Sequence, residues 1–210
     1  ARPPDDDWRR ASAQPVSPAV MTARLLSEET LREPLRRALE SREPRRLPLG
    51  ATTSAAVLVP LIEREGEVSV WLVRRPDGMR SHGGQVAFPG GKSDRSDTSL
   101  RITALREAEE ELGINRSSVD VLGGLDDYMT VTGFTIAPWV GWLAAGVEIR
   151  PSASEVARAF TAPLRTFFEP ASGVALPWQG WTVDGEHVWG ATAAILRGLV
   201  SIVREFDGAQ

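Results

Sequence analysis

Residues 90–114 read GGKSDRSDTSLRITALREAEEELGI, which predicts a Gly-Gly loop just before a helix that contains Glu107, Glu110 and Glu111. At about 100° per residue, positions i, i+3 and i+4 lie on one narrow stripe of a helix surface. Three carboxylates on one stripe repel one another unless a cation neutralises them. Oxygen ligands of this kind suit Mg²⁺ or Mn²⁺, which also bind water and substrate phosphates. The stretch therefore predicts a metal-dependent enzyme that acts on a phosphate-containing substrate.

The rest of the predicted helix agrees with this geometry. A flank of small and aliphatic side chains, which can pack on a sheet, consists of Ala104, Leu105, Ala108 and Leu112. Arg106 lies one turn before Glu110 and can pair with it, whereas Glu109 points to the opposite side and is expected to be solvated. The candidates for the N-cap are Asp97, Thr98 and Ser99. Gly113 suits the left-handed position that ends a helix. The alternative, an ordinary amphipathic helix with an acidic surface, leaves the glycines unexplained.

The glycines and glutamates together resemble the signature of the Nudix hydrolases, G-x5-E-x7-R-E-U-x-E-E-x-G-U, where U is a bulky apolar residue. The matching residues are Gly91, Arg106, Glu107, Glu110, Glu111, Gly113 and Ile114. Asp97 stands in place of the first Glu, and eight residues rather than seven separate it from Arg106. Ala108 is small for the position U. One branch of the family, the coenzyme A pyrophosphatases, shares these departures.

A second signature of that branch, R-x3-G-x3-FPGG, is similar to residues 79–91, MRSHGGQVAFPGG. Its opening part, LLT-x-R-S, falls on residues 71–76, where Leu72 and Arg75 match. Weaker similarity to the branch continues in residues 123–138, 154–164 and 188–193. The resemblance thus spans residues 54–203.

This resemblance implies an α/β (α+β) fold of the Nudix type, an α/β/α sandwich with a mixed β-sheet between helices. It implies hydrolysis of the diphosphate bond of coenzyme A or its thioesters, which gives 3′,5′-ADP and 4′-phosphopantetheine or its acyl form. Two alternatives stay open: a Nudix pyrophosphatase for another nucleoside diphosphate derivative, such as ADP-ribose or a dinucleotide, and a non-catalytic Nudix ligand-binding regulator. The intact set of carboxylates argues against a regulator, because a sensor does not need them.

Several residues in and near the two signatures are candidates for an active site. The expected metal ligands are Glu107, Glu110, Glu111 and the backbone of Gly91. The three glutamates are also the expected catalytic residues, and Glu155 is the candidate general base outside the helix. Arg80 stands at the arginine of the second signature and could bind a substrate phosphate bidentately. Further substrate contacts are expected from Arg74, Arg75, His82, Gly90 and Gly91. The alternatives are ion pairs for the arginines and a loop-stabilising hydrogen bond for His82.

The composition is typical of one enzyme domain with a tail. The chain has 210 residues and a net charge of −4, which gives no sign of nucleic-acid binding. No apolar run reaches the roughly 18 residues of a membrane span. The first residues lack the pattern of a secretory signal, and the absence of cysteine excludes disulfides and thiolate metal sites. We therefore expect a cytoplasmic monomer or homodimer that binds a small coenzyme A-like nucleotide.

The chain divides into three parts. Residues 1–18, with several prolines and a run of Asp, are expected to be a disordered arm. Residues 19–50 should hold a helix at 25–42, with Ser27 as its cap, and a linker; residues 51–210 are the Nudix domain. Strands are expected at 54–62, 68–74, 85–88, 119–126 and 132–142, a loop around 128–131, a late hairpin that turns at 184–185, and a helix at 190–205. Residues 155–161 are either a strand or a short helix.

Deletion of residues 1–18 should leave the free energy of unfolding and the turnover close to those of the full chain, because this composition buries little apolar surface. Denaturation midpoints and turnover numbers of the two chains provide the measurement. A shortened chain that fails to fold would instead show that the arm packs on the domain or bridges subunits.

Overall fold

The long strand β1 (Thr53–Arg64) organises the sheet because it forms hydrogen bonds along both of its edges. Its first part runs parallel to β7 (Phe134–Leu143), and its last part pairs antiparallel with β2 (Glu67–Arg74). The turn from β1 to β2 has positive φ at both of its residues, 55° at Glu65 and 78° at Gly66, which suits a two-residue hairpin. Strand β1 thus lies at the centre of the sheet.

The computed structural model describes residues 27–47, 53–78, 82–171 and 180–207, so the expected arm lies outside the described residues. Within these residues, one mixed sheet contains eight strands in the order β3-β2-β1-β7-β5, with β4 paired to β1, β6 to β7 and β8 to β2. Its other strands are β3 (Val86–Ala87), β4 (Gly90–Lys92), β5 (Val119–Gly124), β6 (Tyr128–Met129) and β8 (Arg158–Pro163). A separate hairpin consists of β9 (Trp181–Val183) and β10 (Glu186–Val188). The described part of the chain also contains the short 3₁₀ helices η2 (Arg116–Ser118) and η3 (Leu164–Phe168).

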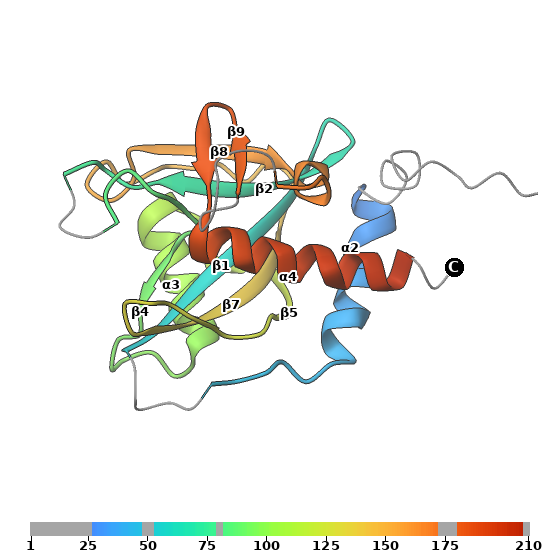
Figure 1. Cartoon of the computed structure of the whole chain (residues 1–210), viewed down its shortest axis with the longest axis horizontal. Coiled ribbons are helices and arrows are strands. Elements are labelled where there is room, and N and C mark those ends of the chain that lie inside the picture. Colours follow the sequence, from blue (N-terminus) through green and yellow to red (C-terminus); the bar gives the residue numbers. More distant parts are fainter. Residues whose placement is uncertain (1–26, 48–52, 79–81, 172–179, 208–210) are drawn as a thin grey trace, which may run out of the picture.

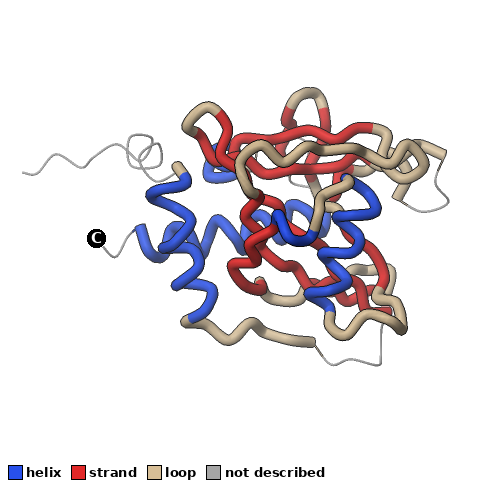
Figure 2. Tube along the Cα trace, turned by 180° about the vertical axis from the view of Figure 1, so that it is seen from behind, coloured by secondary structure: helices blue, strands red, loops and turns tan. Residues whose placement is uncertain are grey.

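Helices cover both faces of this sheet (Figures 1 and 2). Helix α3 (Leu100–Leu112) buries the expected flank, Ala104, Leu105, Ala108 and Leu112, against β1 and β7. Helices α2 (Glu28–Glu40) and α4 (Gly190–Asp207) pack on the other core, which includes side chains from β1, β2 and β7. The expected α/β/α sandwich with a mixed sheet is therefore confirmed.

The N-terminal helix is confirmed with slightly tighter bounds than expected. Ser27 caps α2 through a capping box with Thr30, and the helix buries Leu31, Leu35 and Leu39. The expected start at residue 25 lies outside the described residues. The loop that follows α2 is tied to the sheet, because Asp127 accepts a hydrogen bond from Arg46 Nη1 at 2.7 Å. The helix therefore belongs to the same packed body as the sheet.

Three local expectations need correction or completion. The two glycines, expected in a loop, form β4, because Gly90 and Gly91 pair with β1. The expected loop at 128–131 contains the short strand β6, which pairs with β7. Of the two possibilities for residues 155–161, the strand is the one observed, and it begins at Arg158. The late hairpin turns at Asp184–Gly185 as expected, with φ of 52° and 80°.

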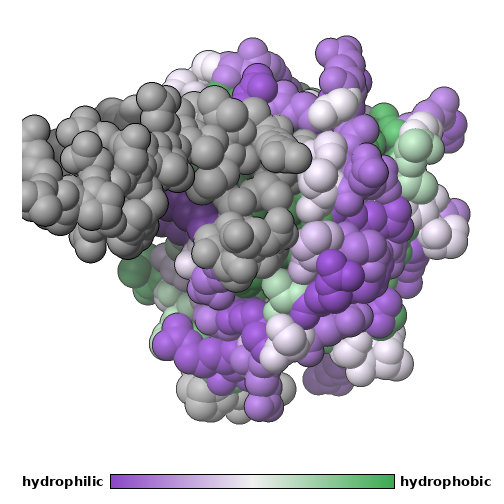
Figure 3. Space-filling model, turned by 90° about the vertical axis from the view of Figure 1, so that its right-hand side faces the viewer, coloured by the Kyte–Doolittle hydropathy of each residue, from purple (hydrophilic) through white to green (hydrophobic). Residues whose placement is uncertain are grey.

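The side of the molecule that carries α2 and the end of α4 shows mainly hydrophilic side chains in the described part of the chain (Figure 3). Among the described residues, no helix is long and apolar enough to cross a membrane. The apolar side chains of α2 and α4 instead face the sheet.

Candidate active site

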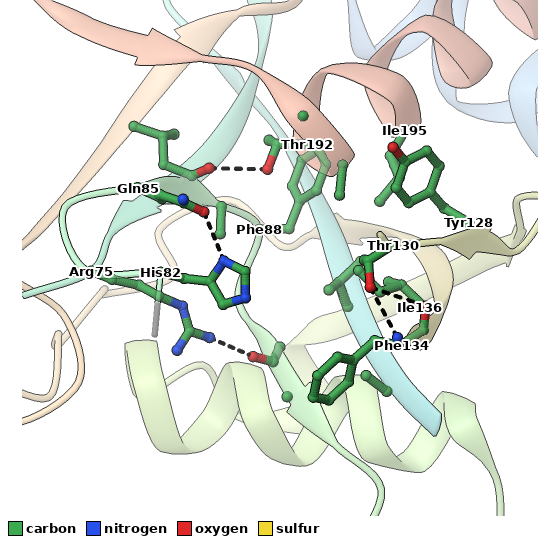
Figure 4. A pocket seen from close by; sticks show the side chains of 18 of the residues that line it. Arg75, His82, Gln85, Phe88, Tyr128, Thr130, Phe134, Ile136, Thr192 and Ile195 are labelled. Atoms are coloured by element: carbon green, nitrogen blue, oxygen red, sulfur yellow. Dashed lines mark hydrogen bonds between the residues drawn. The ribbon is translucent and has the colours of Figure 1, made fainter. Parts of the chain in front are cut away.

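A pocket of about 780 Å³ lies between α3, β4, the β6–β7 loop and the start of α4. This volume suits a nucleotide-sized ligand. The expected site residues that line the pocket are Arg75, His82, Gly90, Gly91, Glu107, Glu110, Glu111 and Glu155. Figure 4 shows Arg75 and His82 on one side of the pocket and Thr130, Phe134 and Ile136 on the other. The pocket thus brings together residues from both sequence signatures.

Helix α3 is fixed at both ends by the residues that its sequence provides. Ser99 is the N-cap, and its Oγ accepts a hydrogen bond from the backbone amide of Ile102 at 3.3 Å. Gly113 ends the helix with φ of 67° and donates its backbone N–H to Glu109 at 2.9 Å. These caps fix the register in which the three glutamates face the pocket.

Arg106 gathers the carboxylates at one edge of the pocket. Its Nη1 donates to Glu107 at 2.8 Å and to Glu110 at 2.9 Å. Its Nε and Nη2 donate to the two carboxylate oxygens of Asp97, at 3.1 and 3.0 Å. Nη2 also reaches the backbone carbonyl of Lys92 at 3.0 Å. Hydrogen bonds from Arg106 hold the pKa of Asp97 well below its usual range. Arg106 therefore ties the loop before α3, strand β4 and the helix together.

Glu111 is the most deeply placed carboxylate of the pocket, with 3% of its surface exposed. Its Oε2 accepts the backbone N–H of Gly90 at 3.1 Å, and its Oε1 lies 3.4 Å from Arg75 Nη2. Burial raises the pKa of Glu111 to about 7, although Arg75 and the Gly90 amide oppose the shift. Burial also raises the pKa of Glu107. A cation in the pocket would relieve the cost of burying these charges.

The two glycines of β4 are required by packing. A Cβ on Gly91 would lie 2.5 Å from the carboxylate carbon of Glu107. A Cβ on Gly90 would lie 2.4 Å from the backbone oxygen of Ala56 on β1. A side chain at position 90 would therefore displace β1, and one at position 91 would displace the Glu107 carboxylate; with glycine at both positions, the backbone of β4 lies directly against the glutamates.

The donor set of this edge fits a hard divalent cation. It offers carboxylate and backbone oxygens, no sulfur, and a glycine backbone that packs against a carboxylate. Among the described residues, no three His, Cys, Asp or Glu side chains are grouped closely enough to hold an ion as they stand. The three glutamates are not grouped because Glu107 and Glu110 hydrogen-bond Arg106, whereas Glu111 hydrogen-bonds the backbone of β4.

The structure separates the two neighbouring arginines at the end of β2. Arg75 lines the pocket, and its Nη2 donates to the backbone oxygen of Gly90 at 3.1 Å. Arg74 does not line the pocket; its Nη2 lies 2.5 Å from Asp77 and its Nε 3.4 Å from Glu186. Arg74 was also expected to contact substrate, and the structure places it outside the pocket lining, because successive side chains of a strand point to opposite faces.

Of the other residues considered in the sequence, His82 and Glu155 line the pocket, whereas Glu109 does not. His82 lines the pocket and has φ of 61°, and its Nδ1 forms a 2.9 Å hydrogen bond with Gln85 Oε1. Glu155 is exposed, lines the pocket and adds negative charge that contributes to the raised pKa of Glu111. Arg80 lies outside the described residues. Glu109 is not a pocket residue; it pairs with Arg116 at 2.6 Å.

Sequence reasoning missed part of the pocket wall. The first turn of α4 lines the pocket, and the buried Oγ1 of Thr192 donates to the backbone oxygen of Val86 at 3.0 Å. Aromatic side chains from Tyr128 and Phe134 form another wall, and Lys92 Nζ lies 5.3 Å from the ring centroid of Phe134. In the sequence, the weak similarity of residues 188–193 to the coenzyme A branch was the feature that pointed to this part of the pocket wall.

In the metal-free protein, the stability should fall as the pH rises from about 4.5 to about 7. The folded state binds the proton of Glu111 more tightly than the unfolded state, because the pKa is raised from 4.5 to about 7. This stabilising contribution is therefore complete below the unfolded pKa and is lost as the pH approaches the folded pKa, at a cost of about 3 kcal/mol. Urea denaturation in the presence of a chelator measures this dependence.

Glu111→Gln should flatten that pH dependence, and Glu109→Gln is the matched control because it lies outside the pocket. Identical pH dependence in wild type and Glu111→Gln would contradict the assignment of the raised pKa.

Comparison with known proteins places this geometry in a family. The family model of the NUDIX domain matches residues 52–170. The Nudix hydrolase NudL of Yersinia enterocolitica is 40% identical over 158 residues, which cover 71% of this chain and 80% of that protein. NudL of Yersinia pestis is also 40% identical, over 71% of this chain and 79% of its own.

Solved structures show the same fold at low sequence identity. The Nudix hydrolase RenU of M. smegmatis has a TM-score of 0.55 and 18% identity, and the match covers 73% of this chain and 87% of that one. A C. elegans Ap4A hydrolase has a TM-score of 0.53 and 16% identity, over 73% of this chain and 98% of that one. With the family match and the carboxylate helix at the pocket, the chain belongs to the Nudix hydrolase family.

Proposed function

We propose that this Nudix hydrolase cleaves the diphosphate bond of coenzyme A or its thioesters, giving 3′,5′-ADP and 4′-phosphopantetheine or its acyl form. One observation carries the proposal: residues of both signatures line the same pocket. The segment that resembles the coenzyme A branch supplies His82, Phe88 and Gly90, and helix α3 supplies the glutamates.

Glu107, Glu110, Glu111 and the backbone of Gly91 are the proposed ligands of Mg²⁺ or Mn²⁺. When bound, such an ion neutralises charge on a diphosphate and lowers the pKa of a water molecule. Arg106 positions the proposed ligands, because it hydrogen-bonds Glu107, Glu110 and the backbone carbonyl of Lys92 on β4 at the same time. Burial raises the pKa of Glu111 to about 7, so a cation bound beside it would displace the proton that this carboxyl still holds at neutral pH.

Substrate contacts are proposed for Arg75, Arg80 and His82, which come from the segment between β2 and β3. Arg75 lies where its guanidinium can hydrogen-bond a phosphate while it also holds the backbone of Gly90. His82 is oriented by Gln85, so its Nε2 is available on the pocket side. Glu155 is the proposed general base, because it lines the pocket from outside α3 and is solvent-exposed. Arg80 is the proposed partner of the 3′-phosphate of coenzyme A.

Changing Glu110 or Glu111 to Gln should lower turnover by roughly 10²-fold or more, or at least ~2.7 kcal/mol, because each change removes a charge from the metal site. The size and hydrogen-bonding capacity of the side chain are kept. Steady-state kinetics with Mn²⁺ measure the loss. Glu109→Gln is the control and should be nearly neutral, since Glu109 pairs with Arg116 away from the pocket. A loss of turnover in Glu109→Gln as large as the loss in Glu111→Gln would contradict the proposed ligand set.

Substrate identity is tested with purified protein and a panel of coenzyme A, its thioesters, 3′-dephospho-coenzyme A, ADP-ribose, dinucleotides and nucleoside triphosphates. Coenzyme A should be cleaved better than its 3′-dephospho form, because a charge-assisted contact to the extra phosphate contributes about 1–3 kcal/mol. Arg80→Ala should reduce that preference and leave the metal requirement intact. A strong preference for ADP-ribose would overturn the coenzyme A proposal and leave the family assignment in place.

A further inference from the structure

Arg74 connects two segments of chain that each form part of the pocket wall, although it does not line the pocket itself. It is the last residue of β2, where its backbone is paired with Val86 on β3 and with Arg158 on β8. Its side chain is 27% exposed and contacts two carboxylates through different nitrogens, Asp77 through Nη2 and Glu186 through Nε. A guanidinium can bridge two such partners in a fixed geometry because its donors are rigidly arranged.

The first connection supports residues 82–85, here called the His82 loop. A Cβ on Gly84 would lie 2.7 Å from Asp77 Oδ1 and 3.6 Å from Arg74 Nη2, so this loop rests directly on the Arg74–Asp77 pair. Gly84 has φ of 72° and donates its backbone N–H to Arg75 at 3.1 Å. Loss of the pair would remove the support beneath the loop and change where His82 enters the pocket.

The second connection holds the β9–β10 hairpin. Glu186 on β10 is shared, because it lies 3.4 Å from Arg74 and 3.2 Å from Arg158 Nη1. Arg158 also donates to the backbone oxygen of Asp184 at 3.2 Å and pairs with the carboxylate of Asp184. These ion pairs hold the hairpin turn against the end of β2 and the start of β8, where Arg74 and Arg158 are paired (Figure 1).

From this hairpin the chain runs directly into the pocket wall. Strand β10 ends at Val188, and α4 begins at Gly190, which has φ of 61°. Gly190, Ala191 and Thr192 line the pocket, and Thr192 is bonded to β3. The hairpin therefore leads directly into the first turn of α4.

We propose that Arg74 is a positioning residue that sets two walls of the pocket, the His82 loop and the first turn of α4, relative to the carboxylates of α3. The inference rests on the proposed use of this pocket for a diphosphate substrate, but it does not depend on which diphosphate that is. Partly exposed ion pairs contribute little to global stability. Neither wall carries the proposed metal ligands, so the effect of Arg74 falls on substrate binding and not on the chemical step.

The test compares Arg74→Gln with wild type on whichever substrate of the panel wild type cleaves best. KM should rise about tenfold, since a small displacement of positioning groups weakens substrate contacts strongly, while kcat and the melting temperature stay close to wild type. The dissociation constant of ADP, measured by calorimetry, should rise in parallel and gives a readout that needs no turnover. Failure of the coenzyme A assignment would therefore leave this test intact.

Two further variants separate the connections. Asp77→Asn weakens only the loop connection and Glu186→Gln only the hairpin connection, so each should raise KM less than Arg74→Gln, and the double variant should match it. Arg74→Lys should restore the function only in part, because an ammonium lacks the planar fork.

Arg116→Gln is the matched control, because it breaks an ion pair with Glu109 that lies outside the pocket. Unchanged KM and ADP affinity in Arg74→Gln would overturn the proposal. So would a fall in kcat or melting temperature with no change in KM, since that pattern indicates a purely structural role.

Discussion

The close packing of strand β4 between β1 and helix α3 is the constraint on which the site depends. Gly91 lies against the carboxylate of Glu107, and Gly90 donates its backbone N–H to Glu111. A larger residue at Gly90 would displace β1, and a larger residue at Gly91 would displace the Glu107 carboxylate. Because β4 is a strand of the central sheet, the rigidity of the sheet is passed on to the carboxylates.

The charges of the pocket are balanced between buried carboxylates and the arginines that contact them. The helix places several acidic groups around one pocket, and burial raises the pKa of Glu107 and Glu111. Arg106 and Arg75 offset part of this charge, and Asp97 holds Arg106 from the other side. The arrangement keeps acidic groups together at a cost in stability, which is typical of a site that binds a cation.

Much of this arrangement was predictable because it is local in sequence. Helical periodicity placed the three glutamates on one stripe, and the residue types at its ends predicted the caps, of which Ser99 was one candidate among three. Turn chemistry predicted the hairpin at Asp184–Gly185. The family resemblance supplied the sandwich, which the helices on both faces of the sheet confirm.

Features that depend on distant parts of the chain were not predictable. Both faces of β2 are largely buried, so its hydrophobic pattern did not indicate which of Arg74 and Arg75 faces the pocket. Strand β4 was expected as a loop because its pairing with β1 is not encoded in its own three residues. The wall formed by α4 comes from a helix far along the chain, which tertiary packing brings to Val86.

The stripe of glutamates on α3 and strand β4 together form the proposed divalent-cation site. Titration of metal-free protein with Mn²⁺, followed by electron paramagnetic resonance, tests it most directly because it needs no substrate. Saturable Mn²⁺ binding with release of protons near pH 7 is expected, and much weaker binding is expected when Gly91 is changed to Ala. Absence of Mn²⁺ binding by wild type, or unchanged binding by Gly91→Ala, would contradict the proposed site.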